Sequence, residues 1–153
     1  MSMTLPLSIQ TSSPELTEAL GAELARHIQD DPTMPPFIAL YGDLGVGKTA
    51  FVRGFASVFA PSSRVKSPTF SLVNEYRGDT RSVFHFDMYR ITDEDELYSI
   101  GFYDYLERNG ICLVEWSENI PFALPDRYLN VEILKDSPTE TDSRRITVSL
   151  ITN

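Results

Sequence analysis

Apolar residues along the chain repeat with two different spacings, which predict helices and strands in alternation. After Ser13-Pro14-Glu15 an apolar side chain recurs at every fourth position up to residue 28. Serine followed by proline is a helix-start signal, because the serine oxygen caps free N–H groups and proline needs no N–H there. Helical spacing returns from Phe51 to Phe59 and stops before Pro61. We therefore expect a first helix that ends at the Asp30-Asp31-Pro32 stretch and a second that ends near residue 59.

Shorter runs of apolar or alternating residues predict the strands. The run Ile111–Val114 is apolar throughout, which is typical of a strand covered on both faces. The turn Arg77-Gly78-Asp79 joins two alternating runs into a hairpin, and the polar stretch 135–143 is expected to be a loop between two late antiparallel strands. The expected strands are 5–9, 37–41, 69–76, 82–87, 111–114, 128–134 and 146–151, with short helices from 92 and over 102–106.

This order of elements favours an α/β protein. The chain has 153 residues, of which 42% are hydrophobic, and that is enough for one good core. No repeat and no low-complexity linker divides it. We expect a P-loop NTPase-like three-layer domain, with a mixed central sheet between helices, that spans residues 1–153 as a single domain.

Charge and cysteine content narrow the possible roles. The formal net charge is -9, which argues against a broad grip on nucleic acid, although a local basic patch is compatible with it. The only cysteine, Cys112, lies in an apolar run and is expected to be a small buried side chain. No run of 18 apolar residues and no secretory signal is visible, so a cytoplasmic location is predicted.

The stretch G-D-L-G-V-G-K-T at 42–49 fits the phosphate-binding pattern G-x-x-x-x-G-K-[ST] at every fixed position. Glycines let the backbone approach phosphate oxygens, and successive N–H groups then form an anion-binding nest at the start of a helix. Lys48 would reach the β- and γ-phosphates, and the Thr49 hydroxyl would face Mg²⁺. Because a strand precedes this glycine loop (residues 42–49) and a helix follows it, the match is in the required context.

Such a site needs an acidic side chain at the end of a neighbouring strand. Asp87 and Glu115 each follow an apolar strand, and Glu115 follows the better candidate for a central strand. We expect Glu115 to be the metal partner and to point into a water-filled site without a buried partner of its own. His85 lies on the same strand face as Asp87, and a structural role is favoured for it. Trp116 is expected either in the core or as a platform beside a nucleotide or partner.

The segment Ser67-Pro68-Thr69-Phe70 lies between the glycine loop helix and the first acid in chain order. P-loop proteins place a mobile segment that senses the γ-phosphate in this part of the chain. An ordinary turn into a strand explains the same residues equally well, so both interpretations stay open from the pattern alone.

Four motifs in this order resemble one known family. They are Y-G-D-L-G-V-G-K-T, V-K-S-P-T-F-S-L-V, H-F-D-M-Y-R and L-V-E-W, and they span residues 41–116. The combination is similar to the bacterial ATPase subunit of tRNA threonylcarbamoyladenosine synthesis, the TsaE family. The resemblance implies a small Mg²⁺-dependent ATPase, weak alone, whose ATP hydrolysis resets the TsaB–TsaD transferase that modifies the adenosine beside the anticodon, with tRNA contacted mainly through those partners.

The resemblance also implies roles for individual residues of this chain. Asp87, Glu115 and Lys48 would be catalytic, and Thr49 and Glu115 would bind the metal. Thr69 would be switch-like and Trp116 would lie beside the nucleotide. The implied ATP contacts are Ser13, Gly45, Val46, Gly47, Lys48, Thr49, Ala50, Thr69, Trp116 and Arg145, with Arg144 as the alternative to Arg145.

Three other functions compete with this interpretation. A small-molecule kinase would need a lid carrying arginines, and the arginines after Asp87 are scattered. A GTPase would need the guanine motif N-K-x-D, which does not occur. A scaffold that binds ATP without cleaving it remains open. A docking face for partners could lie at the aromatic cluster Phe102, Tyr103 and Tyr105, although core packing is the favoured interpretation of that cluster.

Overall fold

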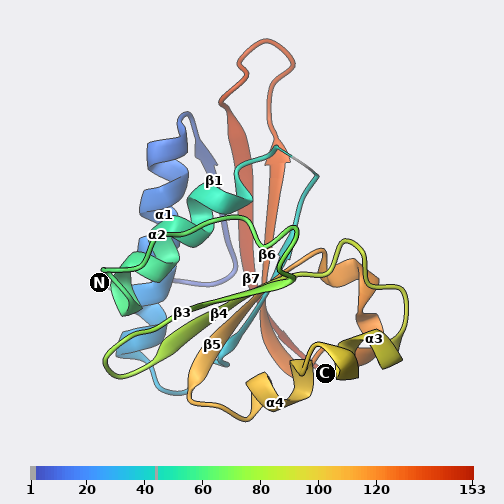
Figure 1. The fold of residues 1–153 in the computed structure, drawn as a ribbon. Helices are drawn as coiled ribbons and strands as arrows, with labels where there is room; N and C mark the ends of the chain where they lie inside the picture. Colours follow the sequence, from blue (N-terminus) through green and yellow to red (C-terminus); the bar gives the residue numbers. More distant parts are fainter. Residues whose placement is uncertain (1–2, 44) are drawn as a thin grey trace.

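The computed structural model describes residues 3–43 and 45–153. A seven-stranded mixed sheet with the order β1-β7-β6-β2-β5-β4-β3 forms its centre (Figure 1). The strands are β1 (Leu7–Thr11), β2 (Phe37–Tyr41), β3 (Val73–Tyr76), β4 (Ser82–Asp87), β5 (Gly110–Glu115), β6 (Arg127–Lys135) and β7 (Arg144–Thr152). The helices are α1 (Pro14–Asp30), α2 (Lys48–Phe59), α3 (Glu94–Ser99) and α4 (Phe102–Leu106), with the 3-10 turns η1 (Ser117–Asn119) and η2 (Pro121–Ala123).

The four central strands β6, β2, β5 and β4 run parallel to one another, and the outer strands pair antiparallel. Parallel strands bring their carboxyl ends to the same edge of a sheet, which is where ligands bind in open α/β sheets. Here that edge carries Tyr41, Asp87 and Glu115, the last residues of β2, β4 and β5. The loop between β6 and β7 projects beyond the sheet at the end where α2 begins (Figure 1).

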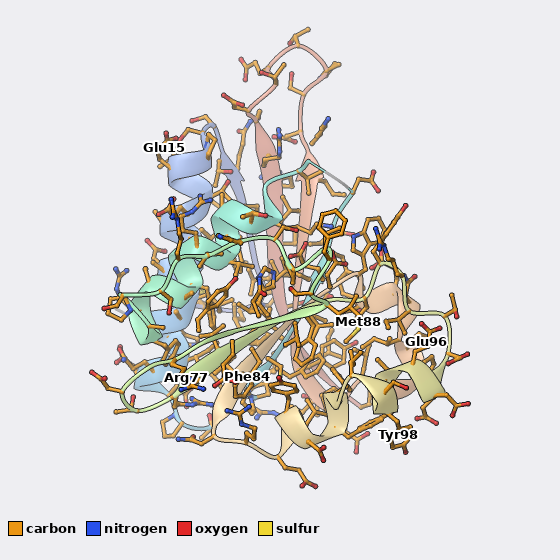
Figure 2. All side chains as sticks on the ribbon, in the orientation of Figure 1. Glu15, Arg77, Phe84, Met88, Glu96 and Tyr98 are labelled. Atoms are coloured by element: carbon orange, nitrogen blue, oxygen red, sulfur yellow. The ribbon has the colours of Figure 1, made fainter. Side chains whose placement is uncertain are left out.

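Two apolar clusters cover the two faces of the sheet, so the helices lie on both sides of it. Along β2, Ile38 and Leu40 belong to the cluster under α1 and α2, whereas Phe37 and Ala39 belong to the cluster with α3 and α4. This alternation follows from the strand period of two. Phe84 of β4, which is labelled in Figure 2, lies on the face of the sheet toward α4. It packs against Tyr105 of that helix, with ring centroids 5.1 Å apart.

The helices α1 and α2 touch closely because a glycine lies on each contact surface. A Cβ atom on Gly54 would lie 1.7 Å from the carbonyl oxygen of Glu18, and one on Gly21 would lie 2.1 Å from that of Phe51. Contacts under 3.0 Å force the backbone to move. The two glycines therefore set the distance between the helices, and α2 carries the glycine loop at its N-terminus.

The structure confirms the predicted mixed α/β architecture and changes some of its details. The first strand begins at Leu7 instead of residue 5, since Pro6 has no N–H for the ladder. The strand predicted for 69–76 is confined to Val73–Tyr76, and β6 runs parallel to β2, antiparallel only to β7. No helix in the described ranges is long and apolar enough to cross a membrane.

The aromatic cluster on α4 is mostly core. Phe102 is fully buried against Phe37 and Phe86. Tyr105 packs on Phe84 and Phe86. These contacts confirm core packing, the favoured interpretation of this cluster.

Gly54→Ala is expected to destabilise the protein, although alanine is the better helix former. Helix propensity alone would stabilise the variant by about 1 kcal/mol. The clash with the α1 backbone reverses the sign, and we expect a loss of about 1–3 kcal/mol in urea unfolding. Arg53→Ala, at an exposed neighbouring position on α2, is the control and should stay within about 0.5 kcal/mol. A Gly54→Ala variant as stable as the wild type would contradict the close contact.

Candidate functional site

A cavity of about 340 Å³ opens at the carboxyl edge of the parallel strands. It lies between the start of α2, the ends of β4 and β5, and the segment before β3. The residues that line it are Gly45, Gly47, Lys48, Thr49, Ser67, Thr69, Asp87, Glu115 and Trp116. The structure thus brings most of the residues singled out in the sequence to one place, although they are spread along the chain from residue 45 to residue 116.

The glycine loop has the backbone conformation that an anion-binding loop requires. Gly45 and Gly47 have φ angles of 78° and 107°, a region that L-residues rarely adopt. Among the described residues no side chain caps the N-terminus of α2, so its first N–H groups are available to a ligand. Position 44 lies outside the described residues. The loop and the helix dipole together favour a bound phosphate.

Lys48 is the one cation among the residues that line this cavity, and its side chain is only 6% exposed. Its Nζ donates to the carbonyl oxygen of Gly42 at 2.6 Å and lies 3.8 Å from Glu115 Oε1. The ammonium also lies 4.4 Å from the centre of the Trp116 ring, a cation–π contact. Burial lowers the pKa of Lys48, and the carboxylates of Glu115 and Asp87 act in the opposite direction. These contacts hold a positive charge at the mouth of the glycine loop.

The two candidate acids lie side by side, because Asp87 pairs with Glu115 in the register of β4 and β5. They are 6% and 5% exposed. Asp87 Oδ1 accepts a hydrogen bond from the Tyr89 N–H at 2.9 Å. Glu115 Oε2 lies 2.5 Å from His85 Nε2. The expectation that Glu115 has no buried partner is therefore wrong, since His85 is fully buried beside it.

Thr69 and Trp116 form part of the rim. Ser67 and Thr69 exchange a hydrogen bond between their hydroxyls at 2.7 Å, in a segment outside any strand. Trp116 has a φ of 59°, and its ring lies 4.9 Å from that of Tyr89. Trp116 takes a part of both positions considered for it, because it lines the cavity beside the glycine loop and also packs against the apolar cluster with α3 and α4.

The cavity suits a magnesium ion that is shared with phosphate groups. Within residues 3–43 and 45–153 no group of three or more His, Cys, Asp or Glu side chains is arranged to hold a metal. Magnesium is usually held by one or two carboxylates together with substrate phosphates, so a complete cage of side chains is not needed. Thr49 and Glu115 supply a hydroxyl and a carboxylate on the cavity wall. The donor set fits Mg²⁺ when a polyphosphate is present.

A second hollow of about 230 Å³ lies on the other side of the glycine loop. Pro14, Thr17, Asp142 and Arg144 line it together with residues 45–47. Ser13 itself caps α1, its Oγ accepting from the Leu16 N–H at 3.2 Å. The first turn of α1 is therefore next to the loop, whereas Ser13 is not among the residues that line this hollow, and its contact with ATP stays a prediction.

Arg144, and not Arg145, contacts the glycine loop. Its Nε donates to the Val46 carbonyl oxygen at 2.7 Å, and a second guanidinium nitrogen lies 3.4 Å from that of Gly45. Arg145 instead pairs with Asp136 at 3.5 Å. Neighbouring residues of a strand point to opposite faces, so only one of the two arginines can reach the loop. Of the two positions considered from the sequence, the geometry favours Arg144.

The comparisons with known proteins agree with these features. A family model described as "Threonylcarbamoyl adenosine biosynthesis protein TsaE" matches residues 11–146. The chain belongs to the TsaE family. The Bacillus subtilis protein named tRNA threonylcarbamoyladenosine biosynthesis protein TsaE is 35% identical over 96% of this chain and 87% of its own length.

Two further relatives extend the comparison. The Haemophilus influenzae protein of the same name is 40% identical over 76% of this chain and 71% of its own length. The crystal structure of Bacillus subtilis YdiB superposes with a TM-score of 0.75 at 30% identity, covering 100% of this chain and 90% of that one. The likeness therefore extends over the whole fold.

Three residues at or behind the site were not singled out by sequence reasoning. Asp142 and Thr17 line the second hollow, and Tyr76 contacts the back of His85. Asp142 lies in a polar stretch that predicts only a loop, and Tyr76 alternates like any strand residue. Tyr76 could have been found from the alternation in the two strands of the hairpin. Residues on the same face of paired strands are neighbours, so the Tyr76 hydroxyl could be expected near His85.

Arg144→Ala is expected to weaken ATP binding, because the glycine loop loses two contacts to a charged donor. Hydrogen bonds to charged groups contribute about 1.5–3 kcal/mol, so affinity should fall by about tenfold or more. Fluorescence titration of Trp116, the only tryptophan, measures it. Arg145→Ala is the matched control and should bind like the wild type. The reverse order of the two variants would refute this placement of the arginines.

Proposed function

We propose that this chain is a P-loop ATPase that acts in the biosynthesis of threonylcarbamoyladenosine in tRNA. One observation carries the proposal: the glycine loop, Lys48 and two buried acids surround a single cavity. Family membership connects that cavity to the tRNA modification. In this proposal residues 1–153 act as one P-loop NTPase domain, and the cytoplasmic location predicted from the sequence stays a prediction.

The chain's own groups divide the work of binding and orientation. The N–H groups of the glycine loop and Lys48 would hold the phosphates, with Val46 and Ala50 in the backbone of that cradle. Thr49 and Glu115 would hold Mg²⁺, which when bound neutralises charge on the phosphate oxygens. Asp87 would orient the attacking water near the γ-phosphate. Trp116 would lie beside the nucleotide, and Thr69 would respond to the γ-phosphate.

Lys48 must change partners when a nucleotide binds. Its ammonium is held by the Gly42 carbonyl and Glu115. A polyphosphate would replace these contacts with charge-assisted hydrogen bonds, which are about twice as strong as neutral ones. The burial that lowers the Lys48 pKa also makes the ammonium favour such a charged partner. The site is therefore prepared for an anion.

A partner is proposed for the turnover step. The segment 67–70 is outside any strand, and Phe70 at its tip is 88% exposed. A partner that covers this segment would fix Thr69 at the cavity and exclude water from it. We propose a transferase pair of the TsaB–TsaD type as that partner, with tRNA contacted mainly through it. A kinase stays the runner-up and a non-hydrolysing scaffold the third candidate.

The isolated chain is expected to hydrolyse ATP slowly, and the transferase pair to raise the rate by about tenfold or more. Partner-supplied charges raise such rates by about 10³- to 10⁵-fold elsewhere, so tenfold is a cautious expectation. Phosphate release with and without purified TsaB–TsaD measures the effect. Equal rates over a range of partner concentrations would contradict the proposal, and a phosphorylated product from a metabolite screen would favour the kinase.

Lys48→Ala is expected to lower ATP affinity by about tenfold or more, because a charge-assisted contact to the phosphates is lost. Titration calorimetry measures the change. Lys135→Ala, at an exposed lysine in β6, is the control and should leave affinity unchanged. GTP should bind more weakly than ATP, since the guanine motif is missing. Unchanged affinity in Lys48→Ala would rule out the assignment of the phosphate site.

Glu115→Gln and Asp87→Asn are expected to separate metal binding from hydrolysis. Both amides keep the size of the side chain, and in Glu115→Gln the amide oxygen can still accept from His85. Glu115→Gln should remove most of the Mg²⁺ dependence of ATP binding. Asp87→Asn should spare binding and lower the hydrolysis rate by about 10²-fold. The opposite outcome in the two variants would mean that the roles of the acids are exchanged.

A further inference from the structure

His85 is the most deeply buried polar side chain next to the proposed metal acid. It lies on β4 with an exposed fraction of 0%. Its Nε2 is 2.5 Å from Glu115 Oε2, and its Nδ1 is 3.2 Å from the hydroxyl of Tyr76 on β3. Both ring nitrogens are therefore engaged, one by the acid and one by a tyrosine that is itself only 4% exposed.

The tyrosine extends this line of contacts to the main chain ahead of the segment 67–70. The hydroxyl oxygen of Tyr76 is 3.3 Å from the amide nitrogen of Lys66 and 3.0 Å from its carbonyl oxygen. A chain of polar contacts thus runs from the Lys66 backbone through Tyr76 and His85 to Glu115. Lys66 precedes Ser67 directly, yet it borders a different hollow from the one that Ser67 and Thr69 line.

One arrangement of protons satisfies every group in this chain. Because the Glu115 carboxylate only accepts, a neutral His85 must carry its proton on Nε2. Nδ1 then accepts from the Tyr76 hydroxyl, whose oxygen accepts from the Lys66 N–H. The carbonyl oxygen of Lys66 keeps a donor, since Asn74 Nδ2 lies 3.0 Å from it. The tautomer is assigned from these partners.

The buried polar groups of His85, Tyr76 and Glu115 need these hydrogen bonds, which apolar side chains at the same positions would not. Burying an imidazole, a phenol hydroxyl and a carboxylate together costs free energy unless each is hydrogen-bonded. The same hydrogen bonds make the orientation of Glu115 depend on the position of the Lys66 backbone. A rotation of the carboxylate toward a cation would pull on His85, and through Tyr76 on the stretch of chain that leads into residues 67–70.

We propose that His85 and Tyr76 are positioning residues that couple the metal acid Glu115 to the segment 67–70. The inference rests on the proposed function, because it assigns regulation to the same nucleotide site. His85 fixes the carboxylate, and Tyr76 transmits its orientation to Lys66. Occupancy of the site by Mg²⁺ and ATP then holds the start of the segment, and a partner that fixes the segment improves the geometry of Glu115.

Amide hydrogen exchange of residues 62–66 tests this coupling without measuring turnover. Of these residues, Ser63, Arg64 and Lys66 border the other hollow, so a bound nucleotide would reach them only through the protein. In the wild type, ATP with Mg²⁺ is expected to slow exchange in this stretch by about fivefold, whereas ATP with a chelator leaves it unchanged. Fluorescence of Trp116 measures ATP affinity with and without Mg²⁺ in the same samples.

Three variants separate the contact between Glu115 and His85 from the contacts that link His85 through Tyr76 to Lys66. Tyr76→Phe removes the hydroxyl and keeps the ring, so it should bind Mg²⁺ and ATP within about twofold of the wild type and lose the slowed exchange. His85→Gln places an amide nitrogen near the Nε2 position, so it should behave in the same way. His85→Asn places the amide group near the Nδ1 position, so Glu115 loses its hydrogen bond. This variant should lose both the slowed exchange and the increase in ATP affinity that Mg²⁺ gives. Tyr103→Phe removes a hydroxyl that bonds Glu94 far from the site and is the control.

The outcomes distinguish the inference from the function on which it rests. A wild type that does not bind ATP with Mg²⁺ overturns both. A wild type that binds, with Tyr76→Phe showing the same slowed exchange as Tyr103→Phe, overturns the coupling and leaves the ATPase proposal standing. Thermal melting of each variant shows whether it folds. If the His85 variants do not fold, the hydrogen exchange of Tyr76→Phe alone decides whether the coupling exists.

Discussion

The burial of the Glu115 carboxylate is the constraint on which the candidate site depends. A buried carboxylate is costly unless it is paired, and here it has a lysine on one side and a histidine on the other. These partners come from α2 and β4, so the acid can be accommodated only when the helix and both strands are in place. The pairing also keeps a negative oxygen and a positive nitrogen at the floor of one cavity.

The parallel centre of the sheet makes that pairing possible. The register that sets Asp87 beside Glu115 also sets Leu40 beside Glu115 on the other flank. The chain leaves β2 next to Glu115, with Asp87 one strand further along the sheet, and turns directly into the glycine loop. The contact of α1 with α2 through Gly21 and Gly54 then fixes the helix that carries Lys48. The register of the sheet and the packing of α1 on α2 therefore together determine where Lys48 lies relative to Glu115.

The two hollows beside the glycine loop have different linings, and this difference gives the site two sides. One side has the acids, the threonines and Trp116. The other has the start of α1, Asp142 and the arginine that bonds the loop carbonyls. A polyphosphate on the loop would have the metal-binding groups on one side and Arg144 on the other. The β6–β7 loop, which projects beyond the sheet in Figure 1, supplies Asp142 to this second side.

Several features were predictable from the sequence because their causes are local. The Ser13-Pro14 start of α1, the end of α2 before Pro61 and the apolar run of β5 each follow from a few adjacent residues. The glycine loop is of the same kind, since its backbone angles depend on glycines within the loop itself. These signals also sufficed to place Asp87 and Glu115 at strand ends as the candidate acids of the site.

The sequence by itself determined the glycine loop, the mixed α/β class and the two acids. Only the tertiary structure decided that Arg144 reaches the loop, that Glu115 has a buried partner, and that Tyr76 and Lys66 lie behind it. The physical reason is that pairing register joins residues far apart in the chain. A shift of one residue between β3 and β4 would have turned Tyr76 to the other face and left His85 without its second hydrogen bond.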